Sequence, residues 1–405
     1  MALTQPTYAR RSADLLGALA GFVRVEAASA ILLITVTLLA LVVANSPLGA
    51  LYEAWLTAKV GPSWLRLSAL HWINDALMAV FFLLIGLEIK REVVSGALSS
   101  VRQASLPLFA AIGGMGLPAA IFVAMNIGNG PALPGWATPV ATDIAFALGI
   151  LTLVGSRAPV SLKVFLTALA VLDDLFVVLI IAVFYTSTLS VLYLLLGACG
   201  LIVLLGFNLL KVVRVWIFLL VGAIVWYCIL RSGVHATLAG VLVALTIPIR
   251  NGDPDGASSP LHRLEDGLHA WVAWLIVPLF AFANAGVSFG IITWDVAAGT
   301  VSVGIVLALF IGKQAGILMA VWAATRAGLA DLPEGTNFRH LHAVAVICGV
   351  GFTMSLFIGS LAFPEGTLEV ATKVGVLTGS LLSGLSGYVL LRMATNGMER
   401  PHMQD

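Results

Sequence analysis

The sequence predicts an all-α polytopic membrane protein with twelve transmembrane helices. Of its 405 residues, 60% are hydrophobic and only 10% are charged, whereas a soluble domain is about 45–50% apolar and about 25% charged. A water-soluble fold keeps a polar exterior and has no means of covering this much apolar surface. Lipid is therefore expected to be the solvent for much of it. The formal net charge of +1 offers no basic face for nucleic acid, so no nucleic-acid partner is expected.

Twelve apolar stretches approach the length that a spanning helix needs, about 20 residues. Most are separated by short connections that carry Pro, Gly, Asn or Asp. The predicted spans are 27–45, 70–89, 106–126, 137–155, 160–184, 191–210, 215–230, 234–249, 269–291, 299–325, 341–363 and 370–391. The chain then divides into an N-terminal segment (1–26), a transmembrane domain (27–393) and a C-terminal tail (394–405). The first connection, about 46–69, is longer and rich in turn residues, which favours a hairpin outside the lipid.

Basic residues orient the predicted spans, because cytoplasmic loops carry an excess of Lys and Arg. With the N-terminus in the cytoplasm, sixteen of the 21 Lys and Arg residues fall on the cytoplasmic side. Four fall outside, and Lys313 remains alone in a span. This asymmetry requires an even number of spans, so both termini are predicted to be cytoplasmic.

Four ionisable residues lie where lipid or apolar core is expected: Asp143, Asp173, Asp174 and Lys313. Each costs at least ~2.5–3.5 kcal/mol to insert, so such residues usually face a cavity or a partner and mark function. The alternative is that they are structural ion pairs between helices. Three acids and one base do not cancel, however, and burial disfavours an unpaired charge. The surplus carboxylates are therefore expected to bind protons or a metal cation.

The adjacent pair Asp173 and Asp174 suggests how such a site works. Neighbouring side chains on a helix point about 100° apart, so one carboxylate can pair with a base while the other lines a cavity. Carboxylates are hard oxygen ligands suited to hard cations. Competition of Na⁺ and H⁺ for the same oxygens, at a site exposed alternately to each side, would by itself be an exchange mechanism.

Two spans carry signals of a broken helix. The first holds Pro139 before Thr142 and Asp143, and the second holds Gly349 and Gly351 among hydroxyl residues. Close helix packing is the alternative explanation for the glycines. Both breaks lie in the middle of helix triplets, at about 106–184 and 299–391, and broken helices at corresponding places in two halves indicate a transporter site. The two triplets are too dissimilar in sequence to prove a repeat.

Broken helices bring helix ends together, and these ends carry partial charges. An acid suits the N-terminal ends and a base suits the C-terminal ends. Asp143 and Lys313 have the signs that this arrangement requires.

A second group of charges occurs at the inner end of the second span, where Glu88, Arg91 and Glu92 are close together. They are either an interfacial anchor or a pH-responsive patch, which Glu265, Asp266 and His269, before the ninth span, are placed to join. His235 opens the eighth span near the outer face. A lone histidine more often caps or packs than titrates.

Four motifs resemble the NhaA family of bacterial Na⁺/H⁺ antiporters. They occur in family order and the likeness extends over about residues 20–393. The motifs are Ala141-Thr142-Asp143-Ile144-Ala145-Phe146-Ala147-Leu148-Gly149, Leu172-Asp173-Asp174-Leu175, Ser232-Gly233-Val234-His235-Ala236-Thr237-Leu238-Ala239-Gly240 and Pro278-Leu279-Phe280-Ala281-Phe282-Ala283-Asn284-Ala285-Gly286.

The resemblance implies an inverted-repeat antiporter fold in the bacterial inner membrane, with two interrupted helices that cross at mid-membrane. It implies an electrogenic exchanger of Na⁺ or Li⁺ for H⁺ that is active at alkaline pH, needs no cofactor and is no enzyme. It also implies a homodimer that forms through the outer hairpin, which maps to about residues 45–58.

The resemblance further implies roles for single residues. Asp174 corresponds to a cation ligand and Asp173 to the ion-pair partner of Lys313, so these two aspartates are the expected cation- and proton-binding residues. Asp143, Lys313 and Thr142 correspond to positions at the helix crossing. Positions associated with the pH response are Glu88, Arg91, Glu92 and Glu265, with His235 as a weaker candidate.

Two departures from the family pattern affect the pH response. Asp266 stands where many members have His, and the loop from Asn251 to Pro260 has no Lys or Arg where the family can be basic. These departures concern the pH set point and not the ion site.

Two other functions fit the sequence less well. An intramembrane aspartyl protease would carry a Gly-x-Gly-Asp motif, which neither Asp143 nor Asp174 has. A proton-coupled symporter for an organic solute would need a large polar or aromatic-lined cavity, and the spans hold few polar residues besides the acids.

Overall fold

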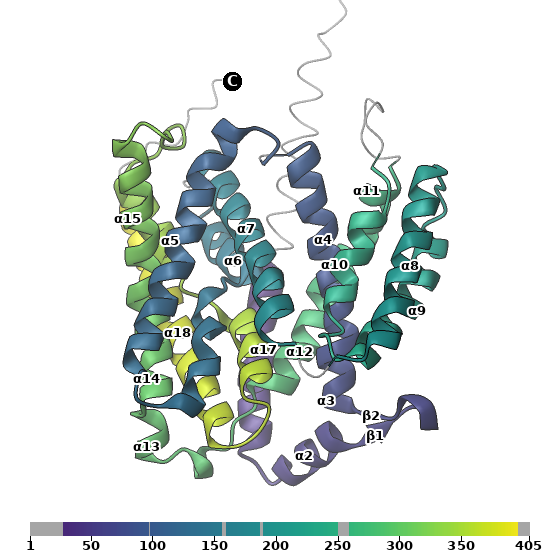
Figure 1. The fold of residues 1–405 in the computed structure, drawn as a ribbon. Helices are drawn as coiled ribbons and strands as arrows, with labels where there is room; N and C mark the ends of the chain where they lie inside the picture. The colour runs from purple at the N-terminus through teal and green to yellow at the C-terminus, as the bar shows by residue number, and fades with distance from the viewer. Residues whose placement is uncertain (1–26, 97, 156–158, 187–188, 250–258, 396–405) are drawn as a thin grey trace, which may run out of the picture.

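The computed structural model describes residues 27–96, 98–155, 159–186, 189–249 and 259–395, which form an all-α bundle with one short sheet in the described part of the chain (Figure 1). A first helix, Ala27–Ala44, precedes the labelled elements. The α-helices that follow are α2 (Gly49–Thr57), α3 (Ala69–His71), α4 (Met78–Val94), α5 (Val101–Met125), α6 (Ile144–Leu153), α7 (Val160–Phe184), α8 (Val191–Leu209), α9 (Val215–Ser232), α10 (Leu238–Thr246), α11 (Pro260–Trp271), α12 (Val277–Ala285), α13 (Trp294–Ala297), α14 (Thr300–Leu307), α15 (Lys313–Arg326), α16 (Phe338–Ile347), α17 (Phe352–Ala362) and α18 (Thr367–Thr395). The predicted segment 1–26 and most of the tail lie outside the described residues, as does most of the loop after Ile249.

Within the described residues, nine helices are long and apolar enough to cross a membrane, or eleven if each of two bent helix pairs is one span. The prediction of an all-α polytopic membrane protein is thus confirmed, but the count of twelve is not. The difference is the predicted span 234–249, of which only the nine residues of α10 are helical. Ile247 leaves the helical conformation with ψ 128°, as expected for a residue that precedes proline, here Pro248.

Three long spans contain a turn of π-helix. The turns are η2 (Trp72–Leu77), between α3 and α4; η5 (Val272–Ile276), between α11 and α12; and η7 (Ala308–Gly312), between α14 and α15. Such turns are frequent at functional sites. The turn η7 ends directly before Lys313, so the local bulge sets the direction of that side chain.

Helices α5 and α15 pack with their backbones in close approach. A Cβ atom added to Gly113 would overlap the carbonyl group of Gly316, and one added to Gly316 would overlap that of Gly113. Small residues permit this approach between membrane helices. The contact fixes α15, and with it Lys313 at the start of that helix, against the centre of the bundle.

The outer segment differs from the prediction of a hairpin at about 45–58. Residues 49–57 contain no turn signal after Gly49 and form α2, whereas the hairpin strands are β1 (Lys59–Val60) and β2 (Leu67–Ser68). They pair antiparallel, with Lys59 opposite Ser68. Gly61 follows β1 with φ 117°, which favours glycine, and so places the turn after α2.

Helix α2 is tied to the end of α12 by side-chain hydrogen bonds. The Tyr52 hydroxyl donates to the Phe282 carbonyl oxygen at 2.6 Å. The Asn45 amide donates to the Val287 carbonyl oxygen at 2.8 Å and accepts from the Phe289 backbone nitrogen at 2.6 Å. The outer segment is therefore held by specific contacts to the last turns of α12 and to the loop that follows.

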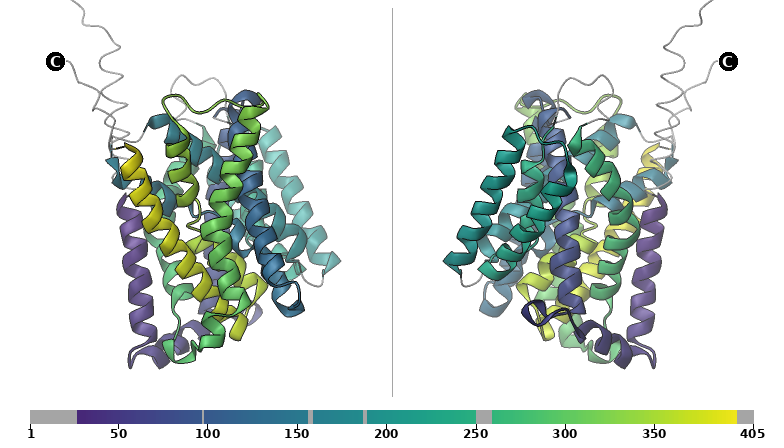
Figure 2. Two further views of the ribbon diagram at one scale, coloured as in Figure 1. Left: turned by 90° about the vertical axis from the view of Figure 1, so that its left-hand side faces the viewer. Right: turned by 90° about the vertical axis from the view of Figure 1, so that its right-hand side faces the viewer.

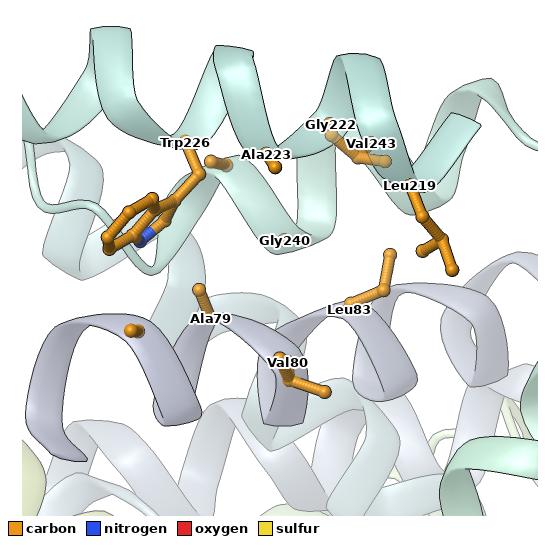
Figure 3. Close-up of a pocket in the computed structure, with 11 residues that line it drawn as sticks. Ala79, Val80, Leu83, Leu219, Gly222, Ala223, Trp226, Gly240 and Val243 are labelled. Carbon is orange, nitrogen blue, oxygen red and sulfur yellow. The ribbon is translucent and has the colours of Figure 1, made fainter. Parts of the chain in front are cut away.

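Helices α8 and α9 form a pair at one edge of the bundle, next to α10 (Figures 1 and 2). A cavity of about 230 Å³ lies between α4, α9 and α10. Small residues line much of it, among them Ala79, Gly222, Ala223 and Gly240, with Trp226 at one end (Figure 3).

Candidate functional site

Two interrupted spans meet at the centre of the bundle. The 3₁₀-helical segment η3 (Gly130–Val140) and α6 are bent by 44° across residues 141–143, and α16 and α17 are bent by 45° across residues 348–351. The linkers touch, because the Asp143 backbone nitrogen donates to the Val350 carbonyl oxygen at 2.7 Å. The two breaks predicted from Pro139 and from the two glycines are therefore brought together in one crossing.

The buried carboxylate of Asp143 serves the N-terminal ends of both half-helices. Its Oδ1 accepts from the Phe146 backbone nitrogen at 3.0 Å in α6. Its Oδ2 accepts from the Thr353 backbone nitrogen at 3.1 Å and from the Thr353 hydroxyl at 2.5 Å in α17. Helix N-termini leave backbone N–H groups unpaired and carry partial positive charge. An acid at this position satisfies both needs at once.

Lys313 occupies the opposite kind of position. Its Nζ donates to the carbonyl oxygen of Val140, the last residue of η3, and lies 2.7 Å from Oδ2 of Asp173. Both side chains are fully buried. The end of a helix presents unpaired carbonyl oxygens and partial negative charge, so the ammonium group compensates that end and the Asp173 carboxylate together.

Thr142 links the ion pair to the crossing. Its hydroxyl donates to Oδ2 of Asp173 at 2.7 Å, the same oxygen that faces Lys313. The hydroxyl oxygen also lies 3.1 Å from the Cys348 carbonyl oxygen in the second linker. One oxygen of Asp173 is therefore engaged twice by the residues of the crossing.

The remaining carboxylate oxygens are less well satisfied. Asp174 is 1% exposed on α7. Among the described residues, Oδ1 of Asp174 and Oδ1 of Asp173 are buried without a hydrogen-bond partner. Buried polar atoms are normally paired. Asp173, Glu88 and Asp143 all interact electrostatically with Asp174, and so does Lys313. Acidic side chains outnumber basic ones around Asp174, so one further positive charge is needed to balance them. A bound proton or a bound cation would supply that charge.

The described residues contain no group of three or more His, Cys, Asp or Glu side chains arranged to hold a metal ion. A cation that binds at Asp174 would therefore need further oxygen ligands from carbonyl groups, hydroxyl groups or water. Such a shell suits a hard cation that is transported as a substrate, because that ion has to leave again.

The predicted pH-responsive residues form a cluster centred on Arg91. Its guanidinium group lies 3.0 Å from Glu92 and 3.0 Å from Glu265, which is on α11. Glu88 interacts electrostatically with Glu265 and with Asp174. The cluster and the buried carboxylates are thereby connected through Glu88.

The structure does not bring His235 to this cluster. His235 precedes the start of α10. Lys90, next to Arg91, instead donates to the carbonyl oxygens of Leu245 and Ile247, at the C-terminal end of α10. The nine residues of α10 rise about 14 Å at ~1.5 Å per residue. His235 therefore lies about one helix length of α10 away from the Arg91 cluster.

Sequence reasoning missed several polar contacts between helices, one of them at the crossing. The Ser380 hydroxyl on α18 accepts from the Phe352 backbone nitrogen at 3.1 Å, at the start of α17. Asn74 and Asn284 exchange amide hydrogen bonds at 3.2 and 2.8 Å. Polar side chains within apolar spans were the available signal, but their partners lie far away in the sequence.

Comparisons with known proteins agree with this geometry. The family model described as Na⁺/H⁺ antiporter 1 matches residues 20–391. Among similar proteins named Na⁺/H⁺ antiporter NhaA, that of Rhodospirillum rubrum is 54% identical over 390 residues, which is 94% of this chain and 98% of the relative. That of Bordetella parapertussis is 53% identical over 395 residues, covering 96% and 98%.

A third relative of that name, from Brucella ovis, is 51% identical over 375 residues, covering 92% of this chain and 94% of the relative. These matches confirm the resemblance inferred from the motifs. The chain therefore belongs to the Na⁺/H⁺ antiporter 1 family.

Proposed function

We propose that the protein is an electrogenic antiporter that extrudes Na⁺, or Li⁺, in exchange for protons entering down their gradient. It thereby controls cytoplasmic pH and sodium. The names of its relatives support the exchange of Na⁺ for H⁺. The observation that carries the proposal is the buried, unpartnered oxygen of Asp174 beside the Asp173–Lys313 pair. The protein is accordingly a secondary active transporter driven by the proton gradient.

Exchange follows from competition at these oxygens. When Asp174 is protonated, the buried side chains of Asp173, Asp174 and Lys313 together carry no net charge. A Na⁺ ion that enters from the cytoplasm displaces the proton and neutralises the carboxylate in its place. Asp174 acts as the cation ligand, and Asp173 becomes a second ligand when its pairing loosens. After Na⁺ has left to the outside, return of the empty site to the cytoplasmic face would require a proton, which couples the two fluxes.

Lys313 has two proposed roles. It braces the crossing through Asp173 and the carbonyl group of Val140. When Na⁺ arrives beside Asp174, its charge competes with the ammonium group for the shared carboxylates, so the pair opens and the lysine releases a proton. Such a second proton would make the exchange electrogenic, because more protons than Na⁺ ions then move in each cycle.

The Arg91 cluster is proposed to set the pH response. Glu88, Glu92 and Glu265 surround one guanidinium group, so their protonation alters the potential near Glu88 and, through it, near Asp174. His235 contributes separately, from the other end of α10.

The proposed setting is the inner membrane of a bacterium, with lipid around the spans and both termini in the cytoplasm. This orientation counts the short helix α10 and the residues that flank it as a twelfth crossing. In that orientation the segments 1–26 and 394–405 are cytoplasmic, and the outer connection that includes α2 and the β1–β2 hairpin forms the contact of a homodimer. The excess of basic residues on one side of the spans supports the orientation.

The test is a Na⁺-induced collapse of a pH gradient in everted membrane vesicles that contain the full-length protein. We expect Na⁺ and Li⁺, but not K⁺, to collapse the gradient, more strongly at alkaline pH. The absence of any response between about pH 6.5 and about pH 9, a range that brackets histidine and raised carboxylate pKa values, would refute the proposal.

A further inference from the structure

A second cavity, of about 460 Å³, opens on the side of the bundle formed by the helix Ala27–Ala44 and α18. Helix α6 and the start of α17 complete its lining. The first helix and α18 stand side by side in both views of Figure 2. We call this cavity the lateral groove. Its volume falls within the range of about 300–1,000 Å³ typical of small-molecule sites.

Each wall of the lateral groove is the apolar face of one helix. The first helix contributes Ile34, Leu38 and Leu41, spaced three and four residues apart as one helix face requires. Helix α18 contributes, among others, Leu377, Leu381 and Leu385, which are four residues apart and also lie on one face. The lining is thus mainly hydrocarbon.

Among the described residues, three side-chain hydroxyls interrupt the lining, those of Thr37, Ser380 and Tyr388. The hydroxyl of Thr37 donates within its own helix, to the Leu33 carbonyl oxygen at 2.7 Å. The hydroxyl of Ser380 accepts from the backbone of α17. None of the described residues that line the groove is charged, so the groove suits an apolar occupant.

The rim of the groove identifies the source of that occupant. Leu38, Leu381 and Leu385 are 57–61% exposed although they are apolar. The helices that carry them are both candidate membrane spans. In a bilayer these rim residues contact lipid, so the groove is continuous with the hydrocarbon phase.

The floor of the groove is the helix crossing itself. The rings of Phe146 and Phe352 lie 5.7 Å apart at an angle of 61° and both line the groove. The Phe146 backbone nitrogen donates to Asp143, and Phe352 precedes Thr353, which donates to the same carboxylate. An occupant of the groove therefore packs on the first turns of α6 and α17.

We propose that the lateral groove is a binding site for one acyl chain of a membrane phospholipid. An acyl chain gains little hydrophobic free energy by moving from the bilayer into the groove, since both are apolar. Its retention rests on van der Waals packing against the two helical walls and the phenylalanine pair on the floor. The packing of the two half-helices around Asp143 then depends on the lipid in the groove.

The experiment uses the full-length protein reconstituted in vesicles that contain phosphatidylglycerol with a diazirine midway along one acyl chain. After irradiation, labelled residues are identified by peptide mass spectrometry. Phe352 is only 4% exposed, so an adduct there requires a chain within the groove. Leu195 on α8 is 60% exposed and reports contact with ordinary surrounding lipid. We expect adducts on both residues; adducts on Leu195 with none on Phe352 or Phe146 would overturn the proposal.

A variant that fills the groove sharpens the test. A Cβ atom at position 384 would lie 3.4 Å from Ile150 and 3.5 Å from Val350, ordinary contact distances, at a position that lines the groove. Gly384→Leu should abolish labelling of Phe352 and leave that of Leu195 unchanged. Ala223→Leu, in the other cavity (Figure 3), should leave both unchanged. Should Gly384→Leu not insert, Leu385→Trp at the rim provides the same test. Undiminished labelling of Phe352 in a folded groove-filling variant would contradict the site.

Discussion

Oδ2 of Asp143, at the break of one interrupted span, lies 3.1 Å from the backbone nitrogen of Thr353, near the start of the half-helix that follows the other break. The same carboxylate also caps its own half-helix through Phe146. Asp143 therefore joins two helix N-termini that are 210 residues apart in the sequence. The crossing depends on this carboxylate on one side and on Lys313 on the other.

Thr353→Val tests the contribution of the threonine hydroxyl to the crossing. Valine keeps the shape but removes the donor that lies 2.5 Å from Oδ2 of Asp143. We expect the free energy of unfolding to fall by about 1–3 kcal/mol, because a buried acceptor loses one of its donors. The thermal unfolding midpoint of the purified protein measures this. Thr353→Ser, which keeps the hydroxyl, is the matched control, and equal midpoints for the two variants would argue against the bond.

Lys313→Gln separates the brace from the proton carrier. Removal of one partner of a buried pair costs up to about 3–5 kcal/mol, so both roles predict a lower thermal unfolding midpoint. The carrier role predicts in addition that any remaining exchange moves no net charge. Transport in proteoliposomes is therefore measured at different imposed membrane potentials. Lys373→Gln removes a lysine from a peripheral pair with Glu369 and should leave the potential dependence intact. Unchanged electrogenicity in Lys313→Gln would exclude the proton-carrier role and leave Lys313 as structural support for the crossing.

Glu265→Gln addresses the pH response. Glu265 pairs with Arg91 on another helix and lies in the cluster that reaches Asp174 through Glu88. Neutralising it should shift the pH at which transport is half-maximal more than it lowers the maximal rate. The measurement is the rate of Na⁺-dependent proton movement as a function of pH. Asp331→Asn, which removes an exposed partner of Arg102, should not shift the profile. A uniform loss of rate at every pH would show that Glu265 has no regulatory role.

Tyr52 predicts an alkaline sensitivity of the outer segment. Burial raises the pKa of Tyr52 to about 12 from the ordinary value of 10.0, against a smaller lowering by a backbone hydrogen bond. A raised pKa in the folded state means that its stabilisation is complete below about pH 10 and is lost as the pH rises toward about 12. Wild-type protein should therefore lose thermal stability over this window.

Tyr52→Phe should lower stability by about 0.5–1.5 kcal/mol at neutral pH, since the hydrogen bond to Phe282 is lost. It should also flatten the decline between about pH 10 and about pH 12, the window between the ordinary and the folded-state pKa of Tyr52. Tyr193→Phe, on the surface pair formed by α8 and α9, is the control. An alkaline decline in Tyr52→Phe as steep as that of the wild type would exclude Tyr52 as its cause.

Much of the fold was predictable because membrane insertion imposes local rules. Apolar length identified most spans, and the breaks were visible as Pro139 and as Gly349 with Gly351. The structure differs from the prediction where the length of an apolar stretch, or the family resemblance, does not determine where a helix ends or a turn forms. Residues 234–249 are apolar enough for a span, but the helix ends at Thr246 before a proline. The hairpin lies later in the chain than the family resemblance implies, because its turn forms at Gly61.

The site was predictable to a smaller extent. Intramembrane charge singled out Asp143, Asp173, Asp174 and Lys313 without any knowledge of contacts. The pairing of Lys313 with Asp173 followed only from the family resemblance, because 140 residues separate them. Contacts made by uncharged groups, such as Ser380 with the start of α17, were signalled only by a polar residue within an apolar span. That signal does not identify the partner, since a serine in a membrane helix usually bonds within its own helix.

The proposed mechanism depends above all on the proposal that Asp174 binds Na⁺ and H⁺ in turn. The most direct measurement is uptake of ²²Na⁺ driven by a pH gradient into proteoliposomes that contain purified wild-type protein or Asp174→Asn. An amide keeps the shape of the side chain but has no proton to exchange, so the variant should be folded and inserted yet show no uptake at saturating Na⁺. Asp295→Asn, which alters an exposed aspartate on α13, should transport like the wild type. Retained uptake by Asp174→Asn would remove this residue from the ion site and contradict the mechanism.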